Sequence, residues 1–347
     1  MRVLITGANG FVGRELVRCL LAVGRLRGQA IGSLLVLDKD LQDLPEDTRL
    51  RRHFGSVTDP ALMRRVLADG IDVVFHLVSV PGGAAEEHYE LGYQVNLLAS
   101  LELLNQLRNK TRPPVLVYAS SVAVYGGALP ARMNETAELH PELSYGTHKA
   151  MVESAISDLA RRGDVDGRVL RLPGIVARPR EPNGLRSAFM SDLMRAFAED
   201  EPYQCPVSPE ATAWWMSSRC CVNNLIHAAE LEGTLLAAQR VWQLPVLHLS
   251  IAQVIDALAE RYGQERRALI SHAPDARLEA LFGRMPPLKT PQARAAGFNH
   301  DRNAATLVRN ALNPSNFRHS PLNGDTLHVA ANQAKTSSRR PLGHPRQ

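Results

Sequence analysis

The amino-acid sequence predicts an α/β fold in which a doubly wound parallel sheet is joined to a smaller α/β lobe. Short apolar stretches at 2–6, 34–38 and 115–120 have the length and composition of buried strands. A helical stretch at 11–23 separates the first two, and this alternation of strands and helices is typical of parallel sheets. A chain of 347 residues, of which 45% are hydrophobic, can bury one large core or two unequal cores.

The first strand runs directly into the turn Gly7-Ala-Asn-Gly10-Phe-Val-Gly13. Glycines let the backbone approach a pyrophosphate closely, and the amino end of a helix attracts its negative charge. Glycines in a turn can also be purely structural, but a strand before them and a helix after them favour a phosphate cradle. The residues predicted to contact a dinucleotide here are Gly7, Asn9, Gly10, Phe11, Val12 and Gly13.

The second strand ends in Asp38, 25 residues after Gly13. A carboxylate near that distance suits the diol of an adenosine ribose and repels a 2′-phosphate, which favours NAD over NADP. Lys39 lies beside this acid, and its positive charge favours NADP instead. The sequence therefore predicts NAD as the cofactor.

The strand at 115–120 delivers Ser121 to its carboxyl end, where ligands lie in open α/β sheets. Tyr145 is the only tyrosine with a lysine four residues later, Lys149, and on a helix this spacing places both side chains on one face. An ammonium near a phenol favours the phenolate, so Tyr145 can serve as a general base near neutral pH. Such a pair also arises by chance on a solvated helix face, but the upstream motifs favour chemistry.

These motifs, taken in order, resemble the extended short-chain dehydrogenase/reductase family of the NAD-dependent epimerase/dehydratase type, whose sheet is of the Rossmann type. The resemblance covers roughly the first half of the chain. The matching pieces are Gly7-x-x-Gly10-x-x-Gly13, Asp38, the acidic turn at 55–59, the segment 74–77, Asn96, the segment 120–126, Tyr145-x-x-x-Lys149 and the segment 171–173.

The resemblance implies that Ser121 hydrogen-bonds the reacting oxygen and that Tyr145 exchanges its proton. It implies that Lys149 binds the nicotinamide ribose and lowers the pKa of the tyrosine. Ser56 stands where the family usually has an aspartate that contacts adenine. The further cofactor contacts implied are Ser56, Val57, Leu77, Asn96 and Pro173.

The substrate region departs from the nucleotide-sugar epimerases of this family, which commonly carry an Asn-containing stretch ending in Tyr-Gly-Pro after the sixth strand. This chain has Arg-Leu-Pro-Gly-Ile-Val-Ala-Arg-Pro-Arg at 171–180 instead, which disfavours a nucleotide diphosphate and brings Arg178 and Arg180 close to the site. The segments at 205–209, 214–219 and 223–230 look like the substrate lobe of the D-erythronate dehydrogenase subgroup, which oxidises a four-carbon sugar acid. That similarity extends to about Leu312.

A small acidic molecule is therefore the expected substrate. Arginines at surface loops also form solvated ion pairs worth about 0–1 kcal/mol, so each guanidinium has an ordinary alternative role. The predicted substrate contacts are Ser79, Ser121, Tyr145, Arg178 and Arg219.

Two activities remain open. The first is NAD-dependent oxidation of the hydroxyl next to the carboxylate of a small sugar acid, giving a 2-oxo acid. The second is an NAD-retaining nucleotide-sugar epimerase or dehydratase, which would use the same serine, tyrosine and lysine. A cofactor-sensing binding protein without turnover is disfavoured because Ser121, Tyr145 and Lys149 are all present.

The composition of the chain indicates the cellular compartment in which we expect the protein. The four cysteines stand at 19, 205, 220 and 221 without a C-x-x-C pair, which predicts free thiols in a reducing cytoplasm and neither a disulfide frame nor a metal site. No run of eighteen apolar residues is present to span a membrane. Met1 lies directly before the first strand, so we expect no signal peptide and a cytoplasmic location.

Most of the net charge of +5 lies in the tail. From Asn313 onward, five basic residues face one aspartate, a net of +4, which leaves +1 for the rest of the chain. A nearly neutral body has no basic footprint for a nucleic acid. The tail is rich in Asn, Ser, Pro and His and lacks hydrophobic periodicity, so we expect a disordered extension.

We therefore expect a nucleotide-binding domain at 1–173, a substrate-binding lobe at 174–312 interleaved with the late strands of the sheet, and the tail at 313–347. Two expected helices, 95–107 and 150–159, carry apolar faces. In the family the corresponding helices pair across a two-fold axis into a four-helix bundle, so a homodimer is predicted.

Overall fold

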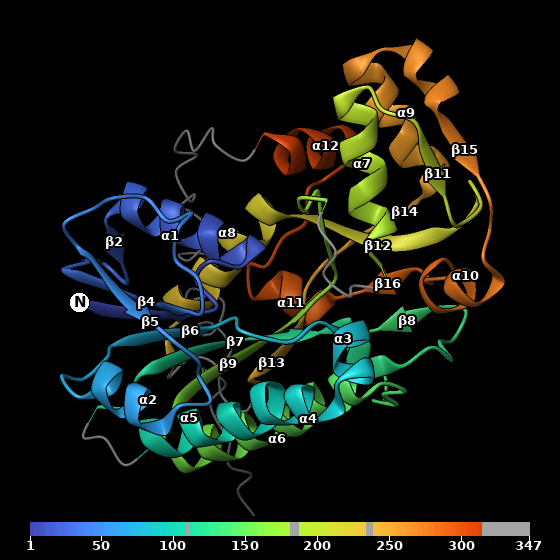
Figure 1. Cartoon of the computed structure of the whole chain (residues 1–347). Helices are drawn as coiled ribbons and strands as arrows, with labels where there is room; N and C mark the ends of the chain where they lie inside the picture. Colours follow the sequence, from blue (N-terminus) through green and yellow to red (C-terminus); the bar gives the residue numbers. More distant parts are fainter. Residues whose placement is uncertain (109–111, 181–186, 234–238, 314–347) are drawn as a thin grey trace, which may run out of the picture. The chain divides into compact units, whose positions relative to one another are not determined.

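The computed structural model describes residues 1–108, 112–180, 187–233 and 239–313 (Figure 1). The chain contacts place residues 1–314 in one compact unit. This unit contains both expected domains, so the boundary at residue 173 stays a prediction. The tail expected to be disordered lies outside the described residues, apart from Asn313.

A seven-stranded parallel sheet forms the centre of the nucleotide-binding half, in the order β5-β4-β1-β6-β7-β9-β13. The strand order reverses between β1 and β6, and ligands bind beyond the carboxyl ends of the strands at such a switch point. The predicted doubly wound parallel sheet is confirmed. The strands are β1 (Arg2–Thr6), β4 (Ser33–Asp38), β5 (Leu50–Phe54), β6 (Val73–His76), β7 (Val115–Ser121), β9 (Asp166–Leu172) and β13 (Val241–Gln243).

Helices cover both faces of this sheet (Figure 1). One face carries α1 (Phe11–Val23) and α8 (Ser218–Glu230), which pack on each other, and the other face carries α2 (Pro60–Leu67), α5 (Ala99–Leu107) and α6 (Ser144–Arg162). Apolar strand residues such as Leu35 and Leu116 form one core cluster with the second group of helices. The helix expected at 95–107 begins as a π-helical turn, Tyr93–Leu98, before α5 continues it.

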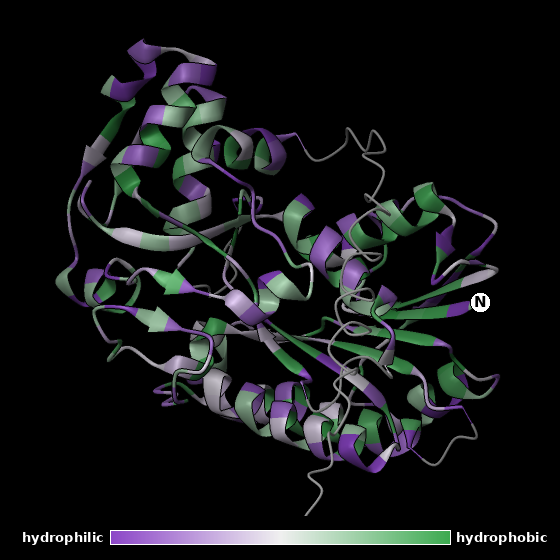
Figure 2. Cartoon of the chain, turned by 180° about the vertical axis from the view of Figure 1, so that it is seen from behind, coloured by the Kyte–Doolittle hydropathy of each residue, from purple (hydrophilic) through white to green (hydrophobic). Residues whose placement is uncertain are grey.

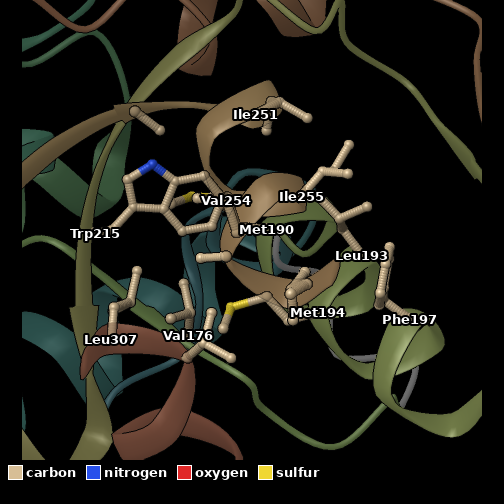
Figure 3. Close-up of a cluster of buried hydrophobic side chains, with 14 of the residues drawn as sticks. Val176, Met190, Leu193, Met194, Phe197, Trp215, Ile251, Val254, Ile255 and Leu307 are labelled. Atoms are coloured by element: carbon tan, nitrogen blue, oxygen red, sulfur yellow. The ribbon is translucent and has the colours of Figure 1, made fainter. Parts of the chain in front are cut away.

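A smaller lobe is built around a three-stranded sheet of β10 (Gly174–Val176), β12 (Thr212–Ser217) and β14 (Leu247–Ser250). Three helices cover it: α7 (Phe189–Glu199), α9 (Ile251–Tyr262) and α12 (Ala304–Leu312). Their apolar side chains meet Trp215 in a second core cluster (Figure 3). The lobe is interleaved with the main sheet, because β13 lies between β12 and β14 in the chain yet pairs with β9.

Short elements complete the two halves. Among them, β11 (Tyr203–Cys205) pairs with β15 (Ile270–His272), and β8 (Met133–Asn134) pairs with β16 (Leu288–Lys289). The others are β2 (Arg25–Leu26), β3 (Gln29–Ala30), α3 (Gly82–Glu87), α4 (Tyr89–Gly92), α10 (Ala276–Phe282), α11 (Pro291–Ala295) and the 3₁₀ turns Val122–Tyr125 and Gln264–Leu269.

The distribution of hydrophobic residues follows this architecture. Figure 2 shows hydrophobic residues concentrated on the strands of the central sheet, while the covering helices mix hydrophobic and hydrophilic residues. In the parts of the chain that the structure describes, no helix combines the length and the apolar character needed to cross a membrane. All four cysteines are buried and free, and burial raises the pKa of Cys221 to about 12.

Candidate active site

The turn between β1 and α1 is a cradle that only glycines can form. Gly7 has a φ of 72°, and a Cβ there would lie 2.6 Å from the backbone nitrogen of Val78. A Cβ at Gly13 would lie 2.1 Å from the carbonyl oxygen of Gly7. Among the described residues no side chain caps the start of α1 at Gly10. The N–H groups of the first helical turn are therefore available to a phosphate.

Asp38 borders this cradle at the carboxyl end of β4. Its carboxylate accepts hydrogen bonds from the backbone nitrogens of Asn9 at 2.9 Å and Lys39 at 2.8 Å. The side-chain oxygen of Asn9 is buried and has no hydrogen-bond partner in the described chain, which leaves it able to bind a ligand. The glycine turn, the carboxylate and this amide together fit the diphosphate and the ribose of NAD.

A cavity of about 800 Å³ runs from the glycine turn into the lobe. It brings together the strand-end serine, the tyrosine and one of the predicted arginines around a single space. The predicted site residues that line it are Gly7, Asn9, Gly10, Phe11, Val12, Gly13, Asp38, Leu77, Ser79, Ser121, Tyr145, Pro173 and Arg178. The predicted residues that do not line it are Ser56, Val57, Asn96, Lys149, Arg180 and Arg219.

Tyr145 lies in the first turn of α6 and faces the end of β7. The side chains of Ser79 and Ser121 lie near its hydroxyl and favour its ionised form. Burial raises the pKa of Tyr145, while the two serine side chains and the positive charge of Arg178 oppose that rise. A phenol held beside two hydroxyl groups in a cavity can exchange a proton with a substrate alcohol.

Lys149 lies one turn after Tyr145 on α6, as the spacing predicts. Its ammonium donates to the carbonyl oxygen of Ala119 at 2.7 Å and lies 5.5 Å from the centre of the Tyr145 ring. Burial lowers the pKa of Lys149 to about 7, although the charge of Glu153 opposes this. Burial raises the pKa of Tyr145 overall, and the positive charge that opposes this rise is that of Arg178. An effect of Lys149 on the tyrosine therefore stays a prediction.

A buried ion pair lies behind these residues. The guanidinium of Arg171 on β9 donates to the carboxylate of Glu153 on α6, with a shortest distance of 2.7 Å. Ser120 donates to the same carboxylate, and Arg171 also donates to the hydroxyl of Tyr125 at 2.9 Å. This network joins α6 to β7 and β9 at the point where Ser121 leaves the sheet.

Asn96 and His76 support the cavity wall from outside its lining. The Asn96 amide accepts from the backbone nitrogen of Val80 at 2.8 Å and donates to its carbonyl at 3.1 Å, which fixes the loop after β6. The His76 ring lies 2.7 Å from the hydroxyl of Thr6 and 3.0 Å from that of Ser100. Burial lowers the pKa of His76 to about 3, so the ring is neutral and links β1 to α5.

Ser56 and Val57, which follow β5, are the expected adenine contacts. Val57 is buried in the core cluster beneath α2, and the hydroxyl of Ser56 lies 2.8 Å from that of Thr58. Neither lines the cavity, so a contact with adenine stays a prediction.

Arg178 follows β10 and is the predicted arginine that lines the cavity. Its guanidinium packs 5.2 Å from the centre of the Phe11 ring, the first residue of α1. Its Nε donates to the carbonyl oxygen of Ile175 at 3.4 Å. Arg178 therefore lies at the border between the glycine cradle and the space beside Tyr145.

The other two predicted arginines lie elsewhere. Arg180 forms an ion pair with Glu201. Arg219 is the second residue of α8, and its charge acts on Glu15 and Cys19 of α1. Arg219 does not line the cavity, because α8 packs on α1 and this position lies near that helix. A contact between Arg219 and the substrate stays a prediction.

Sequence analysis missed one wall of the cavity, which is formed by α10. Arg277, Leu281 and Phe282 from this helix line the cavity together with Trp214. The indole of Trp214 donates to the carbonyl oxygen of Pro286 at 2.7 Å, which ties the segment after α10 to β12. No local motif marks this stretch, and contacts between residues far apart in the sequence bring it to the site.

Comparison with known proteins supports the family assignment. The NAD dependent epimerase/dehydratase family pattern matches residues 3–216. The chain is 40% identical over 314 residues to a D-erythronate dehydrogenase of Cupriavidus necator, a match covering 89% of this chain and 97% of that protein. It is 32% identical over 311 residues to a D-erythronate dehydrogenase of Haemophilus influenzae, with 89% and 98% covered.

Among solved structures, a nucleoside-diphosphate-sugar epimerase from Agrobacterium tumefaciens superposes with a TM-score of 0.83 at 29% identity. The superposition covers 89% of this chain and 93% of that chain. The TM-score shows that the two chains share one fold. The chain therefore belongs to the NAD-dependent epimerase/dehydratase family of extended short-chain dehydrogenases/reductases, and its cofactor is NAD.

Proposed function

We propose that this protein is an NAD-dependent dehydrogenase that oxidises the hydroxyl next to the carboxylate of a small sugar acid, of the D-erythronate type, to a 2-oxo acid. The main support is the guanidinium of Arg178, which lines the same cavity as Tyr145 and Ser121 and whose charge acts on the phenol. An anion held by Arg178 would lie beside the group that takes the proton. The two related D-erythronate dehydrogenases support the same substrate class.

Oxidation of this alcohol removes a proton from the hydroxyl and a hydride from its carbon. Bound NAD supplies the hydride acceptor. Tyr145 takes the hydroxyl proton while Ser121 donates a hydrogen bond to the same oxygen. The charge of Arg178 opposes the rise in the tyrosine pKa, which helps the phenol to act as a base. Lys149 holds the nicotinamide ribose, as the family resemblance implies.

A carboxylate is the group best matched to Arg178. A guanidinium is planar and always charged, and it binds carboxylates through two parallel hydrogen bonds. Arg178 is partly buried, and enclosure strengthens such a contact because less water competes. With the acid held there and the hydroxyl held by Ser121 and Tyr145, the reacting carbon is fixed at two neighbouring points.

A nucleotide-sugar epimerase is the second candidate, and the similarity to the Agrobacterium tumefaciens structure favours it. An epimerase oxidises and re-reduces one substrate, so it forms no net NADH. UDP-sugars and sugar acids offered in parallel separate the two activities. Turnover of a UDP-sugar without activity on any sugar acid would support the epimerase.

Tyr145→Phe tests the proton transfer. Its turnover should fall by about 10²–10⁴-fold, the usual contribution of a positioned acid or base, while NAD binding is retained. The matched control is Tyr262→Phe, because Tyr262 lies on α9 and does not line the cavity. NADH formation and NAD binding are measured for each variant. Near-normal turnover by Tyr145→Phe would rule out its role as the base.

Asp38→Ala tests the cofactor choice. The wild-type protein should have a higher kcat/KM with NAD than with NADP. In the variant these two kcat/KM values should lie closer together, because it loses a hydrogen bond to the ribose and a charge that repels the 2′-phosphate. Asp40→Ala is the control, since Asp40 is exposed and lies outside the cavity lining. A wild-type preference for NADP would mean that the positive charge of Lys39 outweighs the negative charge of Asp38 in the choice of cofactor.

Arg178→Gln tests the substrate anchor. D-Erythronate should reduce NAD in the wild-type protein, whereas the uncharged polyol erythritol should not. Loss of a charge-assisted contact worth about 1.5–3 kcal/mol should raise KM for the acid by about ten- to a hundredfold. Arg180→Gln provides the control, because Arg180 pairs with Glu201 outside the cavity lining. Equal KM values for the two variants would remove Arg178 from this role.

A homodimer is proposed for the protein. Tyr89 and Leu91 of α4 and Met151 of α6 are 55%, 44% and 51% exposed. Helices α4 and α6 contact each other, so these side chains belong to one neighbourhood of the surface. A two-fold interface made by α6 and the helices beside it would bury this apolar patch.

Met151→Glu tests this interface. Light scattering at micromolar concentration should give a dimer mass for the wild-type protein and a monomer mass for the variant, because the interface would have to bury a charge. Val23→Glu adds the same charge to α1, at a residue that is 44% exposed, and should leave the dimer intact. A wild-type monomer would contradict the proposal.

A further inference from the structure

Four charged side chains line the cavity in the described part of the chain: Asp38, Glu142, Arg178 and Arg277. Asp38 borders the glycine cradle, so the remaining three face the substrate space. One negative and two positive charges leave that space with a net charge of +1. The two guanidiniums come from different walls, because Arg178 follows β10 and Arg277 belongs to α10.

Arg277 differs from Arg178 in its surroundings. Arg178 is partly buried, packs on Phe11 and donates to a backbone carbonyl. Arg277 is exposed, and within the described residues its guanidinium makes neither a hydrogen bond nor an ion pair. The fold therefore presents one enclosed cation and one solvated cation to the same cavity.

The helix that carries Arg277 is fixed in place. The carboxylate of Glu279 accepts hydrogen bonds from the backbone nitrogen and the hydroxyl of Ser208 at 2.8 and 3.0 Å. At the end of α10, the carbonyl oxygen of Gly283 accepts from the backbone nitrogen of Thr212 at 2.7 Å. These ties hold α10, and with it Arg277, at the cavity.

We propose that Arg277 is a specificity-determining residue that captures the carboxylate of the substrate at the cavity rim, before the acid reaches Arg178. The inference rests on the proposed function. A solvated cation attracts an anion weakly, and salt screens that attraction over about 8 Å at physiological ionic strength. Arg277 therefore affects the entry and affinity of an acid and leaves the chemical step unchanged.

Arg277→Gln, assayed with D-erythronate and saturating NAD at low and high salt, tests this role. At low salt its kcat/KM should fall about fivefold through a higher KM, equivalent to about 1 kcal/mol, with kcat unchanged. At high salt the variant and the wild-type protein should converge, because screening removes the attraction. At low salt, Arg277→Lys should keep most of the wild-type kcat/KM, since the positive charge remains.

Arg284→Gln is the matched control. Arg284 is an exposed arginine just after α10, and it does not line the cavity. Its variant loses the same charge from the same segment and should follow the salt dependence of the wild-type protein. An equal loss in both variants, a loss confined to kcat, or a loss that persists at high salt would overturn the role of Arg277. Failure of the wild-type protein to oxidise any sugar acid would instead overturn the proposed function, and this inference with it.

Discussion

The buried ion pair between Glu153 and Arg171 fixes the geometry of the candidate active site. Glu153 lies about two turns after Tyr145 on α6, and Arg171 comes from β9, so the pair ties that helix to the sheet. Ser120 donates to the same carboxylate, which holds the end of β7 one residue before Ser121. Removing one partner of a buried pair leaves an uncompensated charge that costs about 3–5 kcal/mol. The relative position of Ser121 and Tyr145 thus depends on this contact.

A second constraint decides where cofactor and substrate meet. Gly7 approaches Val78 so closely that no side chain fits between the turn after β1 and the loop after β6. These two connections flank the switch point of the sheet, and the second carries Ser79, whose side chain lies near the hydroxyl of Tyr145. The glycine turn therefore brings the cradle for the diphosphate next to the group that exchanges the proton. Arg178, which follows β10 of the lobe, packs on Phe11 at the start of α1 and so lies next to this cradle.

The parts of the site that sequence alone predicted are those set by local structure. Asp38 and Tyr145 lie at a strand end and in a first helical turn, and such positions follow from strand and helix boundaries. Arg219 was assigned from a resemblance, but the packing of α8 on α1 decides which way its side chain points. Sequence analysis did not identify Arg277, because hydrogen bonds to residues about 70 positions away bring α10 to the cavity. Asn96 was expected to line the cavity, yet its amide is engaged with the backbone of the loop behind it.

Isotope transfer is the most direct test of the account. D-Erythronate carrying deuterium on the carbon next to its carboxylate is oxidised with NAD, and the reduced cofactor is analysed by mass spectrometry. The account predicts one deuterium in each reduced nicotinamide and none left on that carbon of the product, because a hydride leaves the carbon that Ser121 and Tyr145 hold. Reduced cofactor without deuterium, or deuterium that stays on the carbon chain, would contradict it.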